Sequence, residues 1–590
     1  MREFSVWAPG ADKVELTLAE AAHPMVPAEG GWWHVAVECP PEATYAFSVD
    51  GGDPRPDPQG LRLPHGPHGW SQLFDPVDFV WSDQSWPGVE LEGAVVYELH
   101  VGTFTPDGNL DSAIERLDHL TDLGVTLVEL MPLAPFPGTL GWGYDGVAPF
   151  AVHEPYGGPA ALQRFVDAAH VRGLGVCLDV VYNHLGPDGN YLGEFGPYLT
   201  DTHETPWGPA LNLDAPGSDP VRRWVLDNVT QWLRDFHVDA LRLDAVHELH
   251  DDRALHLLEE MSREVDALAQ REGRKLWLIA ESDRNDPRTV TPRGARDGTG
   301  GLGLHAQWAD DVHHALHVAL TGESQGYYAD FATPEALAKC LRTPFFHDGR
   351  WSSFRGRTHG RPVDDQGSVP GWRFVASLQT HDQVGNRALG DRLSANLTPG
   401  LLACAAAILL SSPWTPMLFM GEEWGATTPW QYFTDHPDPT VGAAVRRGRT
   451  SEFASHDWDH DQVPDPQSPS TFSESKLDWT EVTRARHARL LTWYRELIHL
   501  RRERRDLHDG RLDQIETHHD PERGTLWIRR GEHQVVVNLS DRPRTFEVDG
   551  AVRLSWEPGV SVSDGRIDLP AQSAAIVQPD ATEAAGTLGG

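Results

Sequence analysis

The segment DALRLDAVH, residues 239–247, begins as a short apolar strand and ends in charged side chains. Side chains alternate along a strand, so Arg242 and Asp244 share one face and the two leucines share the other. Charged side chains at the end of a buried strand are hard to explain by packing alone. The segment therefore predicts either a structural ion pair or an aspartate that an arginine holds ionised for nucleophilic chemistry.

Seven further apolar runs of this kind are spread along the chain, and stretches with helical periodicity, such as 110–124 and 220–236, separate them. The runs are VVYELHVGTF (95–104), VTLVELMPL (125–133), GVCLDVVYNH (175–184), KLWLIAES (275–282), LHAQWADD (304–311), FVASLQTHD (374–382) and TPMLFMGEE (415–423). Strand and helix that alternate eight times predict an α/β fold, a (β/α)₈ TIM-type barrel with insertions. In such barrels the residues that do chemistry lie at the carboxyl ends of the strands, where the polar residues of these runs fall.

Two regions of alternating apolar and polar residues flank the predicted barrel. The first contains FSVWAP (4–9), VELTL (14–18), WWHVAVE (32–38) and TYAFSVD (44–50), and the segment WSDQSWPGVELEG (81–93) follows it as a linker. The second contains TLWIRR (525–530), HQVVVNLS (533–540), TFEVDG (545–550), VRLSW (552–556) and AAIVQP (574–579). We expect an N-terminal β-sandwich at 1–88, the barrel at 89–505 and a C-terminal antiparallel β-domain at 506–590, with a disordered tail after residue 580.

Composition excludes several classes of function. The formal net charge of −38 argues against nucleic acid and against an anionic membrane, because phosphate groups require Lys and Arg. The longest apolar run, 401–410, is too short to span a bilayer and fits a buried helix. We expect a cytoplasmic protein because no secretory leader is visible, and reduced thiols because the four cysteines show no CxxC spacing. The 22 tryptophans fit either a core or stacking on sugar rings.

Three other strand ends carry groups that suit work on a sugar. Glu281 follows the apolar residues of 275–280, and a carboxyl group in such surroundings has a raised pKa and can act as a general acid. Its structural alternative is a rim glutamate that caps the next helix. His381 and Asp382 can bind sugar hydroxyls, and the segment DVVYNH (179–184) adds His184. Each of these segments is weak evidence when it stands alone.

Together the four segments resemble the four conserved regions of the α-amylase superfamily, glycoside hydrolase family 13, in order and spacing. The resemblance implies a retaining double displacement with Asp244 as nucleophile, Glu281 as general acid and base, and Asp382 as stabiliser of the transition state. His184, Arg242 and His381 would surround the same sugar ring. The two reacting carboxyl groups of a retaining enzyme lie about 5–5.5 Å apart.

Longer segments narrow the resemblance to one subfamily, which releases trehalose from the end of maltooligosyl trehalose, a neutral oligosaccharide. They are 97–108, 129–152, 196–212, 303–317, 322–331, 381–393 and 416–430. The N-terminal sandwich resembles the carbohydrate-associated modules of branching and debranching enzymes. The alternatives are a 1,4-α-glucan branching enzyme, which shares the domain order, and a catalytically inactive glucan-binding protein, which usually lacks one of the two reacting carboxyl groups.

The resemblance also supplies the remaining substrate-binding candidates. They are Tyr144, His247, Trp308, Asp310, Asp311, Gln383 and Asn386. A glycine-flanked tyrosine can instead anchor a turn, and the adjacent aspartates can instead cap the helix that follows them. The roles of Trp207 and Trp424 stay open between core and substrate, and Glu422 with Glu423 is interpreted as structural.

The sequence departs from the subfamily pattern at one position, and two of its residues raise the question of a calcium site. Thr380 stands where the subfamily leads us to expect asparagine, immediately before His381. Asp179 and Asn183 occupy places that bind calcium in many amylases, but this subfamily generally lacks that site. We therefore expect no metal and no cofactor.

Overall fold

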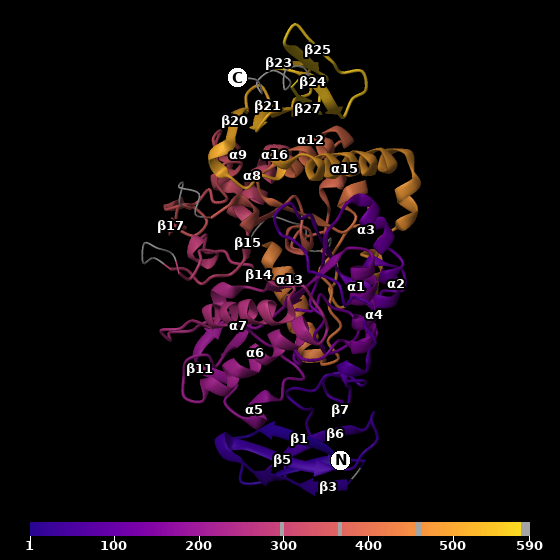
Figure 1. Ribbon diagram of the computed structural model, residues 1–590, viewed down its shortest axis with the longest axis vertical. Helices are drawn as coiled ribbons and strands as arrows, with labels where there is room; N and C mark the ends of the chain where they lie inside the picture. Colours follow the sequence, from indigo (N-terminus) through magenta and orange to yellow (C-terminus); the bar gives the residue numbers. More distant parts are fainter. Residues whose placement is uncertain (20, 295–299, 364–368, 455–462, 580–590) are drawn as a thin grey trace, which may run out of the picture.

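The computed structural model describes residues 1–19, 21–294, 300–363, 369–454 and 463–579. Figure 1 shows the order of the chain in space: the N-terminal sheets form one end, the barrel and its helices the middle, and the C-terminal sheets the other end. The tail predicted to be disordered, 581–590, lies outside the described residues. Within the described residues, the structure contains no helix that is long and apolar enough to cross a membrane.

The centre of the molecule is a closed barrel of eight parallel strands, and each arises from one of the eight predicted runs. In barrel order the strands are β8 (Val96–Leu99), β9 (Leu127–Leu130), β10 (Gly175–Val180), β13 (Ala240–Leu243), β14 (Trp277–Ala280), β15 (Ala306–Trp308), β18 (Phe374–Ser377) and β19 (Thr415–Phe419). The predicted barrel is confirmed. The longer helices that alternate with the strands are α3 (Leu117–Leu123), α4 (Gly158–Val171), α6 (Ser218–Arg234), α7 (Leu257–Glu272), α8 (Asp310–Thr321), α12 (Pro399–Ser411) and α15 (Ala485–Glu503).

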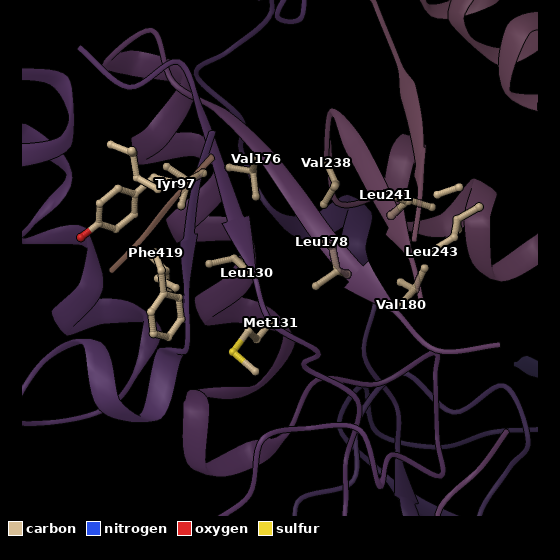
Figure 2. Packing of buried hydrophobic residues seen from close by; sticks show 14 of the residues in the cluster. Tyr97, Leu130, Met131, Val176, Leu178, Val180, Val238, Leu241, Leu243 and Phe419 are labelled. Atoms are coloured by element: carbon tan, nitrogen blue, oxygen red, sulfur yellow. The ribbon is translucent and has the colours of Figure 1, made fainter. Parts of the chain in front are cut away.

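The register of neighbouring strands separates an apolar outer layer from the face that carries the charged side chains. On β10 and β13, Leu178 pairs with Leu241 and Val180 with Leu243, and Figure 2 shows these side chains packed among other buried apolar residues. The intervening positions pair Asp179 with Arg242. The expected alternation is therefore present, and it turns the charged side chains together toward the inside of the barrel.

The N-terminal region forms two antiparallel sheets, with strand orders β1-β5-β4 and β3-β2-β6-β7. The predicted strands are present as β1 (Arg2–Trp7), β2 (Val14–Leu18), β5 (Trp32–Val37) and β6 (Thr44–Val49). Three short strands were not predicted, namely β3 (Ala21–Pro24), β4 (Val26–Pro27) and β7 (Ser71–Gln72). All three lie at sheet edges, where proline is tolerated and the apolar pattern is weak.

The predicted linker at 81–93 also closes the amino-terminal end of the barrel. Asp83 contacts Nδ1 of His170 at 2.7 Å, and Nε2 of the same ring lies 2.9 Å from Asp239, just before β13. The indole of Trp86 donates to Asp239 at 2.7 Å and stacks on His170. A buried imidazole between two carboxylates thus ties the linker to the barrel, and we propose the limits 1–88, 89–505 and 506–590 with this contact at the first boundary.

The C-terminal region forms a five-stranded sheet, β20-β21-β22-β27-β24, and a three-stranded sheet, β23-β26-β25. The five predicted runs appear as β21 (Thr525–Arg530), β22 (His533–Asn538), β23 (Arg544–Glu547), β24 (Ala551–Ser555) and β27 (Ser573–Gln578). The strands β20 (Ile515–Asp520), β25 (Val562–Ser563) and β26 (Arg566–Leu569) are too polar or too short to stand out in the sequence. The apolar run 401–410 lies in α12, which is buried from Ala403 onward and packs against β22 and β27.

Candidate active site

The predicted catalytic residues meet at the carboxyl ends of the barrel strands. Asp244 follows β13, Glu281 follows β14, and Asp382 lies in the short helix α10 (His381–Gly385) after β18. The side chains of Asp244 and Glu281 are 11% and 14% exposed, whereas that of Asp382 is 45% exposed. Two carboxyl groups are therefore largely withdrawn from water, beside a third that is more exposed to solvent.

Asp244 is held at both of its carboxylate oxygens. Nη1 of Arg242 donates to Oδ1 at 2.6 Å, and Nδ2 of Asn183 donates to Oδ2 at 2.8 Å. The same Arg242 nitrogen donates to both oxygens of Asp179, at 2.9 and 3.0 Å. The buried guanidinium thus fixes the orientation of Asp244 without covering it, which is what an attacking carboxylate needs.

Glu281 is anchored beside Asp244 by the backbone between them. The N–H of Ala245 donates to Oε2 of Glu281 at 2.6 Å, and Nη2 of Arg242 lies 3.8 Å from the same oxygen. Ala245 has φ 38°, a left-handed conformation that is costly for a residue other than glycine and is typical of functional sites. Burial raises the pKa of Glu281; Arg242 opposes this rise and Asp244 adds to it. The protonated form, which a general acid requires, is therefore favoured.

The lumen beneath these groups holds buried acids, of which the sequence had singled out only Asp179. Burial raises the pKa of Asp179 to about 7, although Arg242 lowers it, and burial raises the pKa of Glu129 well above its ordinary value. Glu98 accepts hydrogen bonds from the backbone N–H of His381 at 3.0 Å and from its Nδ1 at 2.5 Å. The only signal in the sequence was a glutamate inside each of the apolar runs at 95–104 and 125–133.

Tyr144 and His381 form one wall of the site. The hydroxyl of Tyr144 donates to Asp179 at 2.7 Å and lies 2.8 Å from Nε2 of His381, and the two rings stack with their centroids 5.1 Å apart. Burial lowers the pKa of His381, but Asp382 and Glu98 outweigh it and raise the pKa to about 9. A cationic imidazole is thus placed beside Asp382, 3.4 Å from its Oδ2.

Two predicted residues support other site groups. His184 hydrogen bonds through Nδ1 to Asn183, and its Nε2 lies 3.1 Å from the carbonyl of Tyr144. Trp308 is buried, with its ring 4.4 Å from the guanidinium of Arg242. This contact indicates that Trp308 supports the arginine.

Asn386, Gln383 and the neighbouring Thr380 belong to the segment around α10. Asn386 donates to Asp382 at 3.2 Å, and Gln383 lines a small separate cavity with Arg387. Thr380 caps α10, because its hydroxyl accepts from the N–H of Gln383 at 3.3 Å. Threonine can replace the expected asparagine here because both are good helix caps.

The two adjacent aspartates at the start of α8 face different surroundings. Asp311 accepts hydrogen bonds from the N–H groups of Phe346 and His347, at 2.7 and 2.8 Å, and from Asn285 at 2.9 Å. Its carboxylate therefore orders a loop, and its predicted contact with substrate stays untested. For Asp310, burial and then the charges of Glu281 and Asp382 raise the pKa to about 8. Neither aspartate is the cap of α8, a position that Ala309 occupies.

His247 lies near Glu281, and Tyr327 lies near Asp382 and Asp310. The charge of His247 lowers the pKa of Glu281, which places this ring near the general acid. Partial burial raises the pKa of Tyr327, Asp382 and Asp310 raise it further, and the residue is 39% exposed. Tyr327 was missed because a tyrosine in the segment at 322–331 carries no catalytic pattern.

The tryptophans and the pair of glutamates for which the sequence left two interpretations have clearly different surroundings in the structure. Trp207 is 51% exposed and stacks on His184 with centroids 4.6 Å apart, whereas Trp424 is fully buried. Glu422 accepts from the hydroxyl of Tyr494 at 3.1 Å, and Glu423 lies 2.9 Å from Nε2 of His119. These contacts support the structural interpretation of the two glutamates.

The residues at the positions that bind calcium in many amylases form hydrogen bonds with other side chains of the protein. Asp179 pairs with Arg242, and Asn183 donates to Asp244. Elsewhere in the described part of the chain, His203, Asp214 and Asp252 bring three possible ligand atoms together near the surface. The expected absence of a metal stays a prediction.

Comparison with known families agrees with this architecture. Residues 2–76 match the family model of carbohydrate-binding module 48, the isoamylase N-terminal domain, and residues 76–204 match the α-amylase catalytic domain. A solved structure titled as a putative α-amylase from Salmonella typhimurium is 36% identical, covers 98% of this chain and 97% of its own, and superposes with a TM-score of 0.88. The fold and the site define a glycosidase of the α-amylase type.

Curated relatives place the chain in one family within this class. A malto-oligosyltrehalose trehalohydrolase of Arthrobacter ramosus is 54% identical over 98% of this chain and 99% of its own length. Another, of Saccharolobus solfataricus, is 42% identical over 85% of both chains. A 1,4-α-glucan branching enzyme of Corynebacterium jeikeium is 27% identical over 72% of this chain and 61% of its own. The chain belongs to the malto-oligosyltrehalose trehalohydrolase family.

Proposed function

We propose that this protein hydrolyses the α-1,4-glucosidic bond next to the trehalose end of maltooligosyl trehalose, releasing trehalose and a maltooligosaccharide. The observation that carries the proposal is the near full-length identity to trehalohydrolases, 54% with the Arthrobacter ramosus enzyme. The partly buried pair Asp244 and Glu281, which Arg242 joins, provides the chemistry that such a reaction needs. The resemblance stated from the sequence led to the same family.

In the proposed mechanism Asp244 attacks the anomeric carbon while Glu281 protonates the leaving oxygen, so that a covalent glycosyl-enzyme forms. Glu281, now ionised, then takes a proton from water, which attacks the same carbon and releases Asp244. Arg242 holds the attacking carboxylate in place. Asp382 and His381 face the sugar that is distorted in the transition state, and Tyr144 lies beneath it.

Two alternative functions have less support. A branching enzyme would transfer the released glucan chain to another sugar, but the branching enzyme of Corynebacterium jeikeium is only 27% identical over a smaller share of this chain. An inactive glucan-binding protein would be expected to lack one of the reacting carboxyl groups, and both stand at the site. A cytoplasmic location and independence of cofactors stay predictions from the sequence.

The proposed function predicts a preference that depends on Asp310. Wild-type enzyme should cleave maltooligosyl trehalose with a higher kcat/KM than a maltooligosaccharide of equal length. We expect Asp310→Ala to reduce the ratio of the two kcat/KM values at least ~10-fold, about 1.4 kcal/mol, because a half-buried carboxyl group that the wrong sugar leaves unpaired discriminates between hydroxyl arrangements. Steady-state kinetics with both substrates measures this ratio.

The neighbouring Asp311→Ala is the matched control, and we expect it to lower both kcat/KM values in parallel because its carboxylate orders the loop at Phe346. A ratio that Asp310→Ala leaves unchanged would move trehalose recognition elsewhere in the cleft. No preference in the wild-type enzyme would contradict the proposed function itself.

A further inference from the structure

A groove of about 790 Å³ lies beside the candidate active site. Its lining includes Trp207, Asn386 and Tyr432, together with Val441, Ala444 and Val445 of helix α13 (Pro439–Ala454). The spacing of the α13 residues places them on one face of the helix. The volume of the groove falls within the range of roughly 300–1,000 Å³ that is usual for small-molecule sites. The groove is thus large enough to be a binding site, and none of these α13 residues was singled out in the sequence.

Two residues that line the groove contact residues of the candidate active site. Asn386, which lines it, donates a hydrogen bond to Asp382 at 3.2 Å. Trp207, which also lines it, stacks on His184, and His184 in turn hydrogen bonds to the Asn183 that holds Asp244. The groove therefore adjoins the candidate active site.

The position of the groove on the barrel rim assigns it to one half of the substrate. Glu281, which protonates the leaving oxygen, follows β14, and His247 and Asp310 follow the adjacent strands β13 and β15. The lining residues instead follow β10, β18 and β19. The leaving group lies on the side of its proton donor, so the groove is left for the glycone, the part of the substrate that becomes bonded to Asp244.

The chemistry of the lining suits the faces of neutral sugar rings. Trp207 is half-exposed, and the Tyr432 ring is set by an edge contact with Trp142 at 5.1 Å and by the guanidinium of Arg449 at 5.3 Å. Arg449 also donates to the carbonyl of Gly385 at 2.5 Å. Aromatic rings that are already fixed bind apolar faces at little cost in conformational entropy.

We propose that this groove binds the maltooligosyl chain of the substrate, with Trp207 and Tyr432 against sugar faces and α13 as the opposite wall. This proposal rests on the proposed function, since it assigns the remaining part of the same substrate. It makes α13 a determinant of chain-length preference, a property that the sequence alone did not reveal.

The test uses maltooligosyl trehaloses of increasing glycone length and two variants. Trp207→Ala removes an aromatic ring against which a sugar face would pack, and Ala444→Trp fills the groove from α13. For each variant we expect the ratio of kcat/KM for a long glycone to kcat/KM for a single-glucose glycone to fall at least ~10-fold, the loss expected when an aromatic contact or its space is removed. Arg447→Trp, which adds the same bulk at an exposed position of α13 outside the lining, should leave the ratio unchanged.

Binding of maltohexaose, measured by calorimetry on the same proteins, separates this proposal from the proposed function. Both groove variants should weaken maltohexaose binding at least ~10-fold, whether or not trehalose is the product. Circular dichroism establishes that the variants are folded. A ratio and an affinity that neither folded variant changes would overturn the groove assignment, whereas absence of trehalose release by wild-type enzyme would overturn the function alone.

Discussion

Replacing Asp244 with asparagine is expected to lower kcat at least ~10⁴-fold, which corresponds to about 5.5 kcal/mol of activation free energy. An amide cannot form the glycosyl ester, so the double displacement stops at its first step. The amide occupies nearly the same volume, and the contacts with Arg242 and Asn183 leave the surrounding structure in place. Stopped assays of released trehalose measure the loss, and thermal unfolding checks the fold.

Asp179→Asn provides the matched control for this prediction. Asp179 binds the same Arg242 nitrogen but lies below the reacting groups in the barrel lumen. We expect this replacement to lower kcat ~10- to 100-fold, because the change disturbs the arginine that positions Asp244 but does not remove the nucleophile. An Asp244→Asn protein with a loss no larger than that of Asp179→Asn would remove Asp244 from the role of nucleophile.

Replacing Glu281 with glutamine is expected to reduce kcat ~10³-fold on maltooligosyl trehalose, within the range for loss of a general acid. With α-maltosyl fluoride, whose leaving group needs no proton, the first step should recover at least ~10-fold relative to the natural substrate. Burst kinetics with the fluoride follow this step separately from hydrolysis of the intermediate. Equal losses with both substrates would contradict the assignment of Glu281 as the acid.

The Glu281→Gln variant also tests which group sets the alkaline limb of the pH profile of kcat/KM. Glu281 works as an acid only while protonated, so kcat/KM should fall as pH rises through its pKa, which burial raises. Asp310 also has a raised pKa, about 8, and is the other candidate for an alkaline limb. Glu281→Gln should abolish the limb and Asp310→Asn should keep it. The reverse pattern would assign the limb to Asp310.

The barrel was predictable because each strand is a local pattern of apolar residues that ends in polar ones. The same pattern placed Asp244 and Glu281 at strand ends, and the structure brings both to Arg242. Their roles came from the resemblance and stay proposals. Edge strands such as β4 could not be predicted, because two residues that include proline carry no periodicity.

Contacts between distant residues account for most of what the sequence did not reveal. Glu98 is 283 positions from the His381 that it supports, and no local pattern relates them. Asp310 and Asp311 are adjacent and of the same type, yet only the fold turns one toward the loop at Phe346. In the same way, burial alone separates the core residue Trp424 from the exposed Trp207.

The most direct test of the account is the anomeric form of the first products from maltooligosyl trehalose, followed by proton NMR. Asp244 and Glu281 are held side by side by one guanidinium and one backbone N–H, which leaves Asp244 to attack directly. Double displacement at this pair retains configuration. We predict that trehalose and the α-anomer of the maltooligosaccharide appear together before mutarotation. A first-formed β-anomer, or a first product other than trehalose, would contradict the account.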